Sequence, residues 1–465
     1  MPGPTPSTTT SPAPARTGSR AAVVLACGGP FVSLLDVTIV NLAVPALAAD
    51  FRGASLSDLT WVITSYAIVF AALLAPLGRL ADGVGRRNLY AVGLGVFTIA
   101  SAGCALAPSL GWLLVARTAQ GIGAAALVPT SLAIVLGEVA PEARTRAIGA
   151  WAASASLAAA LGPSIGGVLV ETLGWRSIFL INVPIGVGLA LVVRAASAER
   201  QSGELPDLVG SALLAGGIGG VVLGISKGND WGWSATSTVL SIGAGLTLLG
   251  AAVLRSWQHP RPGLEVGLWR NPTYAAANLV SVFFGLMLYP WLLLGILFLT
   301  DVWHYSELQA GVAMTHGAIA SAVTGVVVSR RSLSPRTCVV VGSLILAATA
   351  WVMAAVLPED PAFLALWIPT GITCGIGIGM SSTGVSAAAA MSAPAEKFAS
   401  STGLNLTARQ IGGAVGIALL AALLTHDLGT SLEDYSAAYV MCGAAALLAG
   451  VAGGGLRTGT KMAHR

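Results

Sequence analysis

Long apolar segments alternate with short polar stretches along almost the whole chain. A helix needs about 20 apolar residues to cross the hydrocarbon core of a bilayer, and most of these segments have that length. The pattern therefore predicts an all-α integral membrane protein. About fourteen spans are expected, at residues 21–48, 59–77, 88–107, 111–136, 147–170, 177–194, 208–226, 236–254, 274–300, 306–328, 338–357, 363–387, 399–425 and 436–456.

Composition supports this prediction. Hydrophobic residues make up 55% of the 465 residues and charged residues only 9%, whereas a soluble domain carries about 25% charged residues. The formal net charge of +4 does not indicate a nucleic-acid partner, because the basic residues are scattered singly over short loops. The lipid bilayer is the expected surrounding of the chain.

The sequence contains no pattern that predicts catalysis or metal binding. The five cysteines lie far apart in apolar segments, which favours neither disulfides nor a metal site. Neither the phosphate-binding G-x-x-x-x-G-K-[ST] nor the zinc-binding H-E-x-x-H occurs. We therefore expect no enzymatic activity and no cofactor, and an ion gradient as the energy source.

The loops carry charges of different sign on alternate sides. Cytoplasmic loops of membrane proteins attract Lys and Arg. If the N-terminus is cytoplasmic, only Arg52, Arg176 and Lys227 of the loop cations fall outside, together with acids such as Asp50 and Asp230. This segregation predicts a multi-pass protein of the cell membrane with both termini in the cytoplasm.

The middle and the ends of the chain differ from the rest. Residues 1–20 are rich in Pro, Thr and Ser, which predicts a disordered cytoplasmic N-terminus, and residues 457–465 form a predicted cytoplasmic tail. The spans 208–226 and 236–254 are glycine-rich, and removing them leaves six spans on each side. The predicted organisation is a six-helix bundle over 21–200, two additional helices over 201–258, and a second six-helix bundle over 259–456.

One charged stretch separates the second and third predicted spans, Gly78-Arg79-Leu80-Ala81-Asp82-Gly83-Val84-Gly85-Arg86-Arg87. Its glycines allow a tight reversal, and its arginines exclude it from hydrocarbon. On its own, it predicts a charged hairpin loop. A role of Arg86 and Arg87 only in orienting the chain in the membrane is the alternative.

Two charged residues lie inside predicted spans. Asp36 is an acid in the first span, a placement that costs about 3 kcal/mol on insertion scales. Such a group is suited to gaining and losing a proton, unless another helix neutralises it for structural reasons. Arg117 lies about 9 Å below the outer end of its span, and Asp36 lies about 18 Å below the outer end of its own. The two side chains could therefore pair directly or be bridged by water or by Gln120.

Several of these stretches resemble the major facilitator superfamily. Residues 78–87 are similar to the loop between its helices 2 and 3, except that Gly83 stands where the family usually has a basic residue. Residues 35–45 resemble the first-helix signature of its fourteen-span drug:proton antiporters, 113–123 the fourth-helix motif, and 162–167 the antiporter signature G-P-x-x-G-G. The resemblance implies the major facilitator fold, two six-helix bundles plus two extra central helices.

The resemblance also implies roles for single residues. Asp36 and Arg117 would couple transport to protons, and Asp82 would dock against the start of the 399–425 span to latch the outward-facing state. The 162–167 signature marks exporters in that family, although it could also be a kink without bearing on direction. The expected gating residues are Gly78, Asp82, Gly85, Arg86, Arg87, Gly162, Pro163, Gly166, Gly167 and Arg409.

His316 is not explained by these signatures. It lies about 15 Å into its span, and an imidazole titrates near neutral pH. It is either a packing histidine or a second proton or substrate site. An apolar substrate cavity is expected to involve the following side chains, although each aromatic ring taken alone is more typical of packing or of the membrane interface: Asn41, Tyr66, Gln120, Phe284, Tyr289 and Trp351.

The sequence is therefore predicted to encode a proton-coupled multidrug or antibiotic exporter that works by alternating access. Its expected partners are protons and a small hydrophobic or cationic drug-like substrate, and a monomer is expected. Dedicated export of an endogenous metabolite for self-resistance is the alternative. The 162–167 signature disfavours an uptake symporter, and Asp36 with Arg117 disfavours a transport-inactive membrane sensor.

Overall fold

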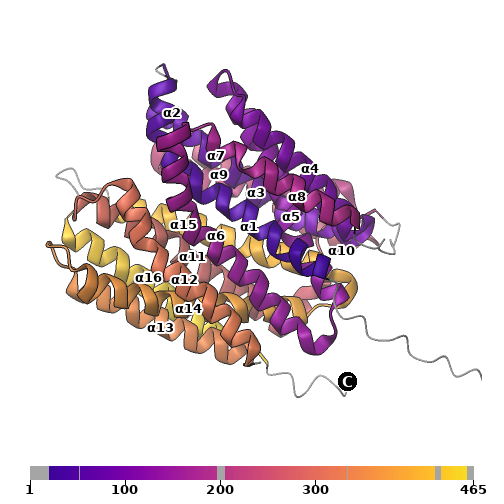
Figure 1. The fold of residues 1–465 in the computed structure, drawn as a ribbon. Helices are drawn as coiled ribbons and strands as arrows, with labels where there is room; N and C mark the ends of the chain where they lie inside the picture. Colours follow the sequence, from indigo (N-terminus) through magenta and orange to yellow (C-terminus); the bar gives the residue numbers. More distant parts are fainter. Residues whose placement is uncertain (1–19, 52, 196–204, 332, 425–430, 458–465) are drawn as a thin grey trace, which may run out of the picture.

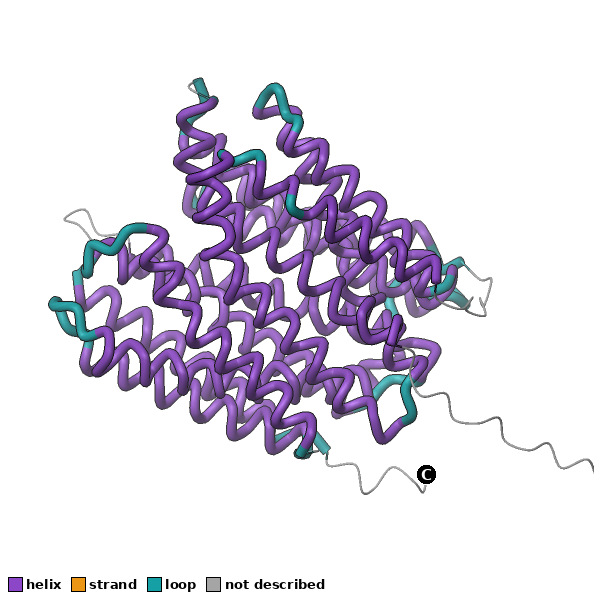
Figure 2. The backbone as a smooth tube through the Cα atoms, in the orientation of Figure 1, coloured by secondary structure: helices purple, strands orange, loops and turns teal. Residues whose placement is uncertain are grey.

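In a computed structural model, the chain forms two bundles of long helices that lie against each other (Figure 1). The structure describes residues 20–51, 53–195, 205–331, 333–424 and 431–457. The predicted N-terminal and C-terminal tails thus lie almost wholly outside the described residues. Within the described ranges, Figure 2 shows helices and loops and no strand.

Fourteen helical segments of the described residues are long and apolar enough to cross a membrane, which confirms the predicted number of spans and the all-α fold. The helices are α1 Arg20–Val40, α2 Val44–Asp50, α3 Leu56–Val84, α4 Arg86–Ala105, α5 Leu110–Glu138, α6 Arg144–Leu173, α7 Ser177–Leu180, α8 Asn182–Ala195, α9 Leu208–Trp231, α10 Thr236–Gln258, α11 Pro272–Asp301, α12 Glu307–Arg330, α13 Pro335–Val356, α14 Ile368–Met391, α15 Phe398–Leu424 and α16 Leu432–Gly453.

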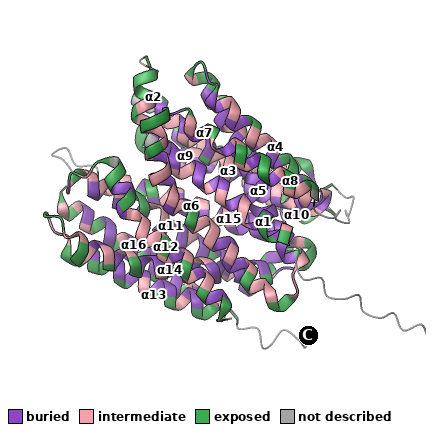
Figure 3. Cartoon of the chain, viewed as in Figure 1, coloured by how far each residue is buried: buried purple, intermediate pink, exposed green. Residues whose placement is uncertain are grey.

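Two pairs of helices join the bundles. Helix α6 of the first bundle packs along α12 of the second, and α3 packs along α15. Buried residues line these contacts and the inside of each bundle, while the outer faces stay exposed (Figure 3). Exposed Leu and Val side chains on the outer faces suit a chain that is surrounded by lipid.

The central pair of helices lies beside the junction of the bundles. Helix α9 packs against α3 and α15, whereas α10 packs mainly against α9. Large apolar side chains of α10, such as Val239, Leu246 and Leu254, stay exposed. The predicted boundary at 258 coincides with the end of α10, and the boundary near 200 lies outside the described residues. The division into three parts stays a prediction.

The charged stretch 78–87 is not the loop that the sequence predicts. Helix α3 continues through Val84 and α4 begins at Arg86, so only Gly85 lies outside a helix. Its φ of +101° is one that residues with a side chain rarely adopt. The preceding residues are compatible with a helix and pack against the second bundle, so the reversal needs one glycine rather than three.

Two predicted spans are interrupted. The first bends at a short 3-10 helix, Asn41–Ala43, before α2, and the sixth is divided between α7 and α8. Conversely, α11 runs continuously through Pro290. Asparagine and proline favour such bends locally, but packing decides which of them interrupts a helix.

Candidate functional site

Asp36 and Arg117 form a buried ion pair. The carboxylate of Asp36, on α1, is 0% exposed, and the guanidinium of Arg117, on α5, is 1% exposed. Arg117 Nη1 lies 2.6 Å from Asp36 Oδ2. Gln120 Nε2 and Asn182 Nδ2 each donate to Asp36 Oδ1 at 2.8 Å. The carboxylate is thus bonded from three sides, and a buried charge of this kind needs such partners.

Arg117 also has partners other than Asp36. Arg117 Nε donates to the Val62 carbonyl at 2.9 Å, and Nη1 lies 2.6 Å from Gln120 Oε1. The ring of Tyr66 lies 4.4 Å from Arg117 Cζ, a cation–π distance. These contacts join α1, α3, α5 and α8 around one charged centre.

The structure decides between a direct pair and a bridge for Asp36 and Arg117, and it adds one residue to the predicted site. Arg117 reaches Asp36 directly, and Gln120 contacts both of them. Sequence reasoning missed Asn182; the only signal was an amide at the start of an otherwise apolar segment.

A second cluster lies at the opposite end of α3, which we call the Asp82 end. Asp82 Oδ2 accepts from the backbone N–H and the hydroxyl of Ser400 at 2.8 and 2.6 Å, and Oδ1 accepts from the N–H of Ala399 at 3.3 Å. Both residues belong to the first turn of α15, where free N–H groups and the helix dipole favour an anion. The carboxylate therefore connects the two bundles.

The arginines after Gly85 continue this cluster. Arg86 Nη2 lies 3.1 Å from Asp82 Oδ1 and also donates to the Ala395 carbonyl of the second bundle. Arg87 pairs with Glu138 at the end of α5. Arg86 is thus a bridging residue, and Arg87 forms an ion pair with a residue of its own bundle.

Glycines allow the bundles to approach closely near both clusters. A Cβ atom on Gly78 would lie 2.5 Å from the Ala399 carbonyl oxygen. On α6, Gly162 packs against Thr38 of α1, and Pro163 packs against Gly311 of α12. Gly166 is buried on the same helix, and Gly167 packs against Leu308. The predicted gating residues of 162–167 thus lie where α6 meets α1 and α12.

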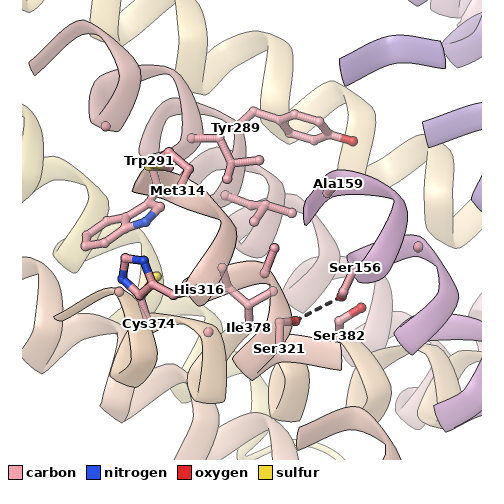
Figure 4. Close-up of a pocket in the computed structure, with 18 of the residues that line it drawn as sticks. Ser156, Ala159, Tyr289, Trp291, Met314, His316, Ser321, Cys374, Ile378 and Ser382 are labelled. Carbon is pink, nitrogen blue, oxygen red and sulfur yellow. Dashed lines mark hydrogen bonds between the residues drawn. The ribbon is translucent and has the colours of Figure 1, made fainter. Parts of the chain in front are cut away.

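A cavity of about 230 Å³ lies between the bundles (Figure 4). Leu34, Thr38 and Ser156 reach it from the first bundle, and most of its wall comes from the second. Ser156 and Ser321 are hydrogen-bonded at 3.0 Å across the junction (Figure 4). Of the residues predicted from sequence, four line the cavity: Phe284, Tyr289, His316 and Arg409.

Four residues expected at a substrate cavity do not line it. Tyr66 and Gln120 are buried around Arg117 and Asp36. Asn41 is exposed in the bend after α1. Trp351 is 42% exposed and its indole packs against Gly443. Their spacing along the helices does not tell which face meets the cavity, because each helix also has a packing face.

His316 lies in the cavity wall. Its Nε2 is 3.2 Å from the Trp367 carbonyl oxygen, which can only accept, so this nitrogen carries the proton. Its ring meets Phe363 edge to face at 6.4 Å. The histidine is thus both a packing residue and a cavity residue.

Titratable groups outside the spans also form pairs. Asp50, beyond the end of α1, accepts from Trp175 Nε1 and Arg176 Nη1, each at 2.9 Å, and these bonds lower the pKa of its carboxyl group.

Among the residues that the structure describes, no three His, Cys, Asp or Glu side chains gather in a way that could hold a metal ion.

Comparisons with known proteins give one consistent result. The sequence profile of the Major Facilitator Superfamily matches residues 26–417 and 276–461. The chain is 32% identical to the multidrug resistance protein Stp of Mycobacterium tuberculosis over 88% of this chain and 76% of that protein. It is 33% identical to the methylenomycin A resistance protein of Streptomyces coelicolor, over 91% of this chain and 89% of the relative.

The fold also matches a solved structure. The human organic anion transporter MFSD10 superimposes with a TM-score of 0.65 at 16% identity, over 93% of this chain and 99% of that one. At this identity the match concerns the fold alone.

Proposed function

Because the chain belongs to the Major Facilitator Superfamily, we propose that it exports drug-like molecules through a cell membrane in exchange for protons. Relatives that are named for multidrug resistance or for resistance to methylenomycin A support this proposal. The observation that carries the proton coupling is the buried pair of Asp36 and Arg117.

The position of Asp36 supports a coupling mechanism. Leu34 and Thr38 lie on the same helix and line the cavity, so a change at Asp36 is transmitted to the cavity by two residues of α1. Protonation of Asp36 removes its attraction for Arg117 and leaves the arginine to its remaining partners, Gln120 and Val62. Helices α1 and α5 can then move relative to each other.

The Asp82 end serves as the gate in this proposal. Closing it requires that Asp82 accept the free N–H groups of α15 and that Gly78 lie against Ala399. We place this end in the cytoplasm, because Lys and Arg concentrate there. The described conformation is then closed toward the cytoplasm, and opening requires that these bonds break.

A drug-susceptibility panel in an efflux-deficient host tests the proposal. The host expresses the wild-type chain, Asp36→Asn, or the control Asp434→Asn, which alters the capping-box carboxylate at the start of α16 in the second bundle. Wild type and control should raise the tolerated concentration of several drugs, and Asp36→Asn should not. Equal resistance from Asp36→Asn, at equal protein level in the membrane, would contradict proton coupling through this residue.

The same panel separates the two modes of export. Resistance to several unrelated drugs supports a multidrug exporter. Resistance to a single compound supports a dedicated exporter, and two relatives are named for resistance to one compound, methylenomycin A. We expect a monomer to suffice, because one chain provides the whole described wall of the cavity.

A further inference from the structure

Arg409 is a buried cation without an ion-pair partner among the described residues. It lies on α15 and is 8% exposed. Its Nε and Nη2 atoms are buried and donate to no acceptor, and no ion pair involves this residue within the described ranges. Since a guanidinium is charged at any physiological pH, the chain leaves a full positive charge uncompensated.

The surroundings of Arg409 do not compensate for this charge. The ring of Phe284 lies 5.1 Å from its Cζ atom, which provides a cation–π contact but no hydrogen-bond acceptor. The neighbouring hydroxyl of Tyr289 bonds to the side chain of Gln410. In contrast, Arg117 in the first bundle has a carboxylate, an amide and a carbonyl as partners.

The cavity beside Arg409 is positive and largely apolar. Among the described residues that line it, none carries a carboxylate, and Arg409 and His316 are the ones that can carry a positive charge. Asp36, two residues before the cavity residue Thr38, is already paired with Arg117. The remaining wall includes the aromatic side chains of Trp291, Trp367 and Tyr439.

We propose that Arg409 binds the carboxylate of the exported substrate, so that this chain carries amphipathic organic anions rather than cations. The planar fork of a guanidinium matches a carboxylate with two parallel hydrogen bonds, and the apolar wall accepts an aromatic or aliphatic body. The proposal rests on the proposed export function and names its substrate class. It replaces the expectation of a cationic substrate and gives Arg409 a role in binding rather than in gating.

Three probes of one shape test the charge preference: a naphthalene carboxylate, naphthylmethanol and naphthylmethylammonium. Their binding to the purified full-length chain is measured by calorimetry at neutral pH. Wild type should bind the carboxylate on the order of tenfold or more tightly than the other two, because charge-assisted hydrogen bonds discriminate by that amount. Equal affinities, tighter binding of the ammonium, or no binding of the carboxylate up to millimolar concentration would overturn the proposal.

Variants assign the preference to Arg409. Arg409→Met removes the charge at similar length and should abolish the preference, whereas Arg409→Lys keeps the charge without the fork and should retain part of it. Arg330→Gln removes an exposed charge at the end of α12 and should bind as wild type does. An unchanged preference in Arg409→Met would overturn the proposal. If this variant does not fold, a full wild-type preference in Arg409→Lys overturns it, because a gating role predicts no loss.

The outcome is separable from that of the proposed function. Asp36→Asn should lose proton-coupled export and still prefer the carboxylate probe, because Asp36 does not line the cavity. Export of cations in exchange for protons, unaffected by Arg409→Met, would leave the proposed function intact and overturn the anion proposal alone.

Discussion

The carboxylate of Asp36 and the guanidinium of Arg117 lie 2.6 Å apart, and both are almost completely buried. The two residues are on different helices, α1 and α5. A buried ion pair gains little net stability over apolar residues, but removing one partner strands a charge. The pair is therefore a poor stabilising device, and it suits the proposed switch, in which one proton on Asp36 decides whether the helices attract each other.

Single substitutions in this pair should cost more stability than the double substitution. Arg117→Met leaves Asp36 with only the amides of Gln120 and Asn182, and should lower the free energy of unfolding by about 3–5 kcal/mol. The double variant Asp36→Asn with Arg117→Met strands no charge and should be closer to wild type. Thermal unfolding in detergent measures the stability of the two single variants and the double variant. A double variant that is as unstable as the sum of both singles would contradict a direct pair.

An exposed pair provides the control for that comparison. Arg176 and Asp50 lie 2.9 Å apart with side chains 49% and 44% exposed. Arg176→Gln should change the unfolding midpoint little, since exposed ion pairs contribute about 0–1 kcal/mol.

Asp82→Asn should open the end of the molecule that Asp82 closes. The amide lacks the negative charge that the first turn of α15 favours. Its NH2 group is a donor and would face the N–H and hydroxyl donors of Ser400. A loss of about 2 kcal/mol shifts the balance between closed and open states roughly thirtyfold. Spin labels at the exposed positions Asn88 and Glu396 should report longer distances in the variant. Distances identical to those of wild type would contradict a latch.

Gly78→Val should have the same effect by steric means. Its side chain would meet the Ala399 carbonyl, 2.5 Å from the Cβ position, and hold α3 away from α15. Gly95→Val is the matched control, because the Cβ position of this α4 glycine has no neighbour within 4 Å. The same label pair should lengthen in the first variant only. A lengthening in both would indicate a general loss of packing.

Asp207→Asn should destabilise the chain in a pH-dependent way. Arg255 donates to both oxygens of this carboxylate, at 2.5 and 2.9 Å, and these bonds lower its pKa. A group with a lowered pKa in the folded state stabilises above its unfolded pKa, about 4, and loses this contribution as the pH falls through the folded pKa. The midpoint difference between wild type and variant should thus be full at pH 7 and shrink as the pH falls below about 4. A difference independent of pH would assign the effect to packing.

Much of the fold follows from the sequence alone. The spans are recognisable because each must fill the hydrocarbon thickness with apolar residues, which leaves a strong periodic signal. The turn at Gly85 is less predictable, since residues 78–84 are polar enough for a loop and become helical only because α15 packs beside them.

The site is predictable where a residue is unusual for its surroundings. Asp36 and Arg117 stand out as charges in apolar spans, and the structure brings them into contact. Asn182 and the cavity wall do not stand out, because neutral side chains on apolar helices give no sign of the face they occupy. The partners of a helix, and not its own sequence, decide whether Trp351 or Trp291 meets the cavity.

Infrared difference spectroscopy of the reconstituted chain tests the central claim, that Asp36 takes up and releases the coupled proton. Spectra of wild type and Asp36→Asn are compared while the pH is stepped and an exported drug is added. The account predicts a protonated carboxylic acid band that appears in wild type in one half of the cycle and is missing in Asp36→Asn. An Asp36 that stays ionised and paired with Arg117 under every condition, while export continues, would contradict it.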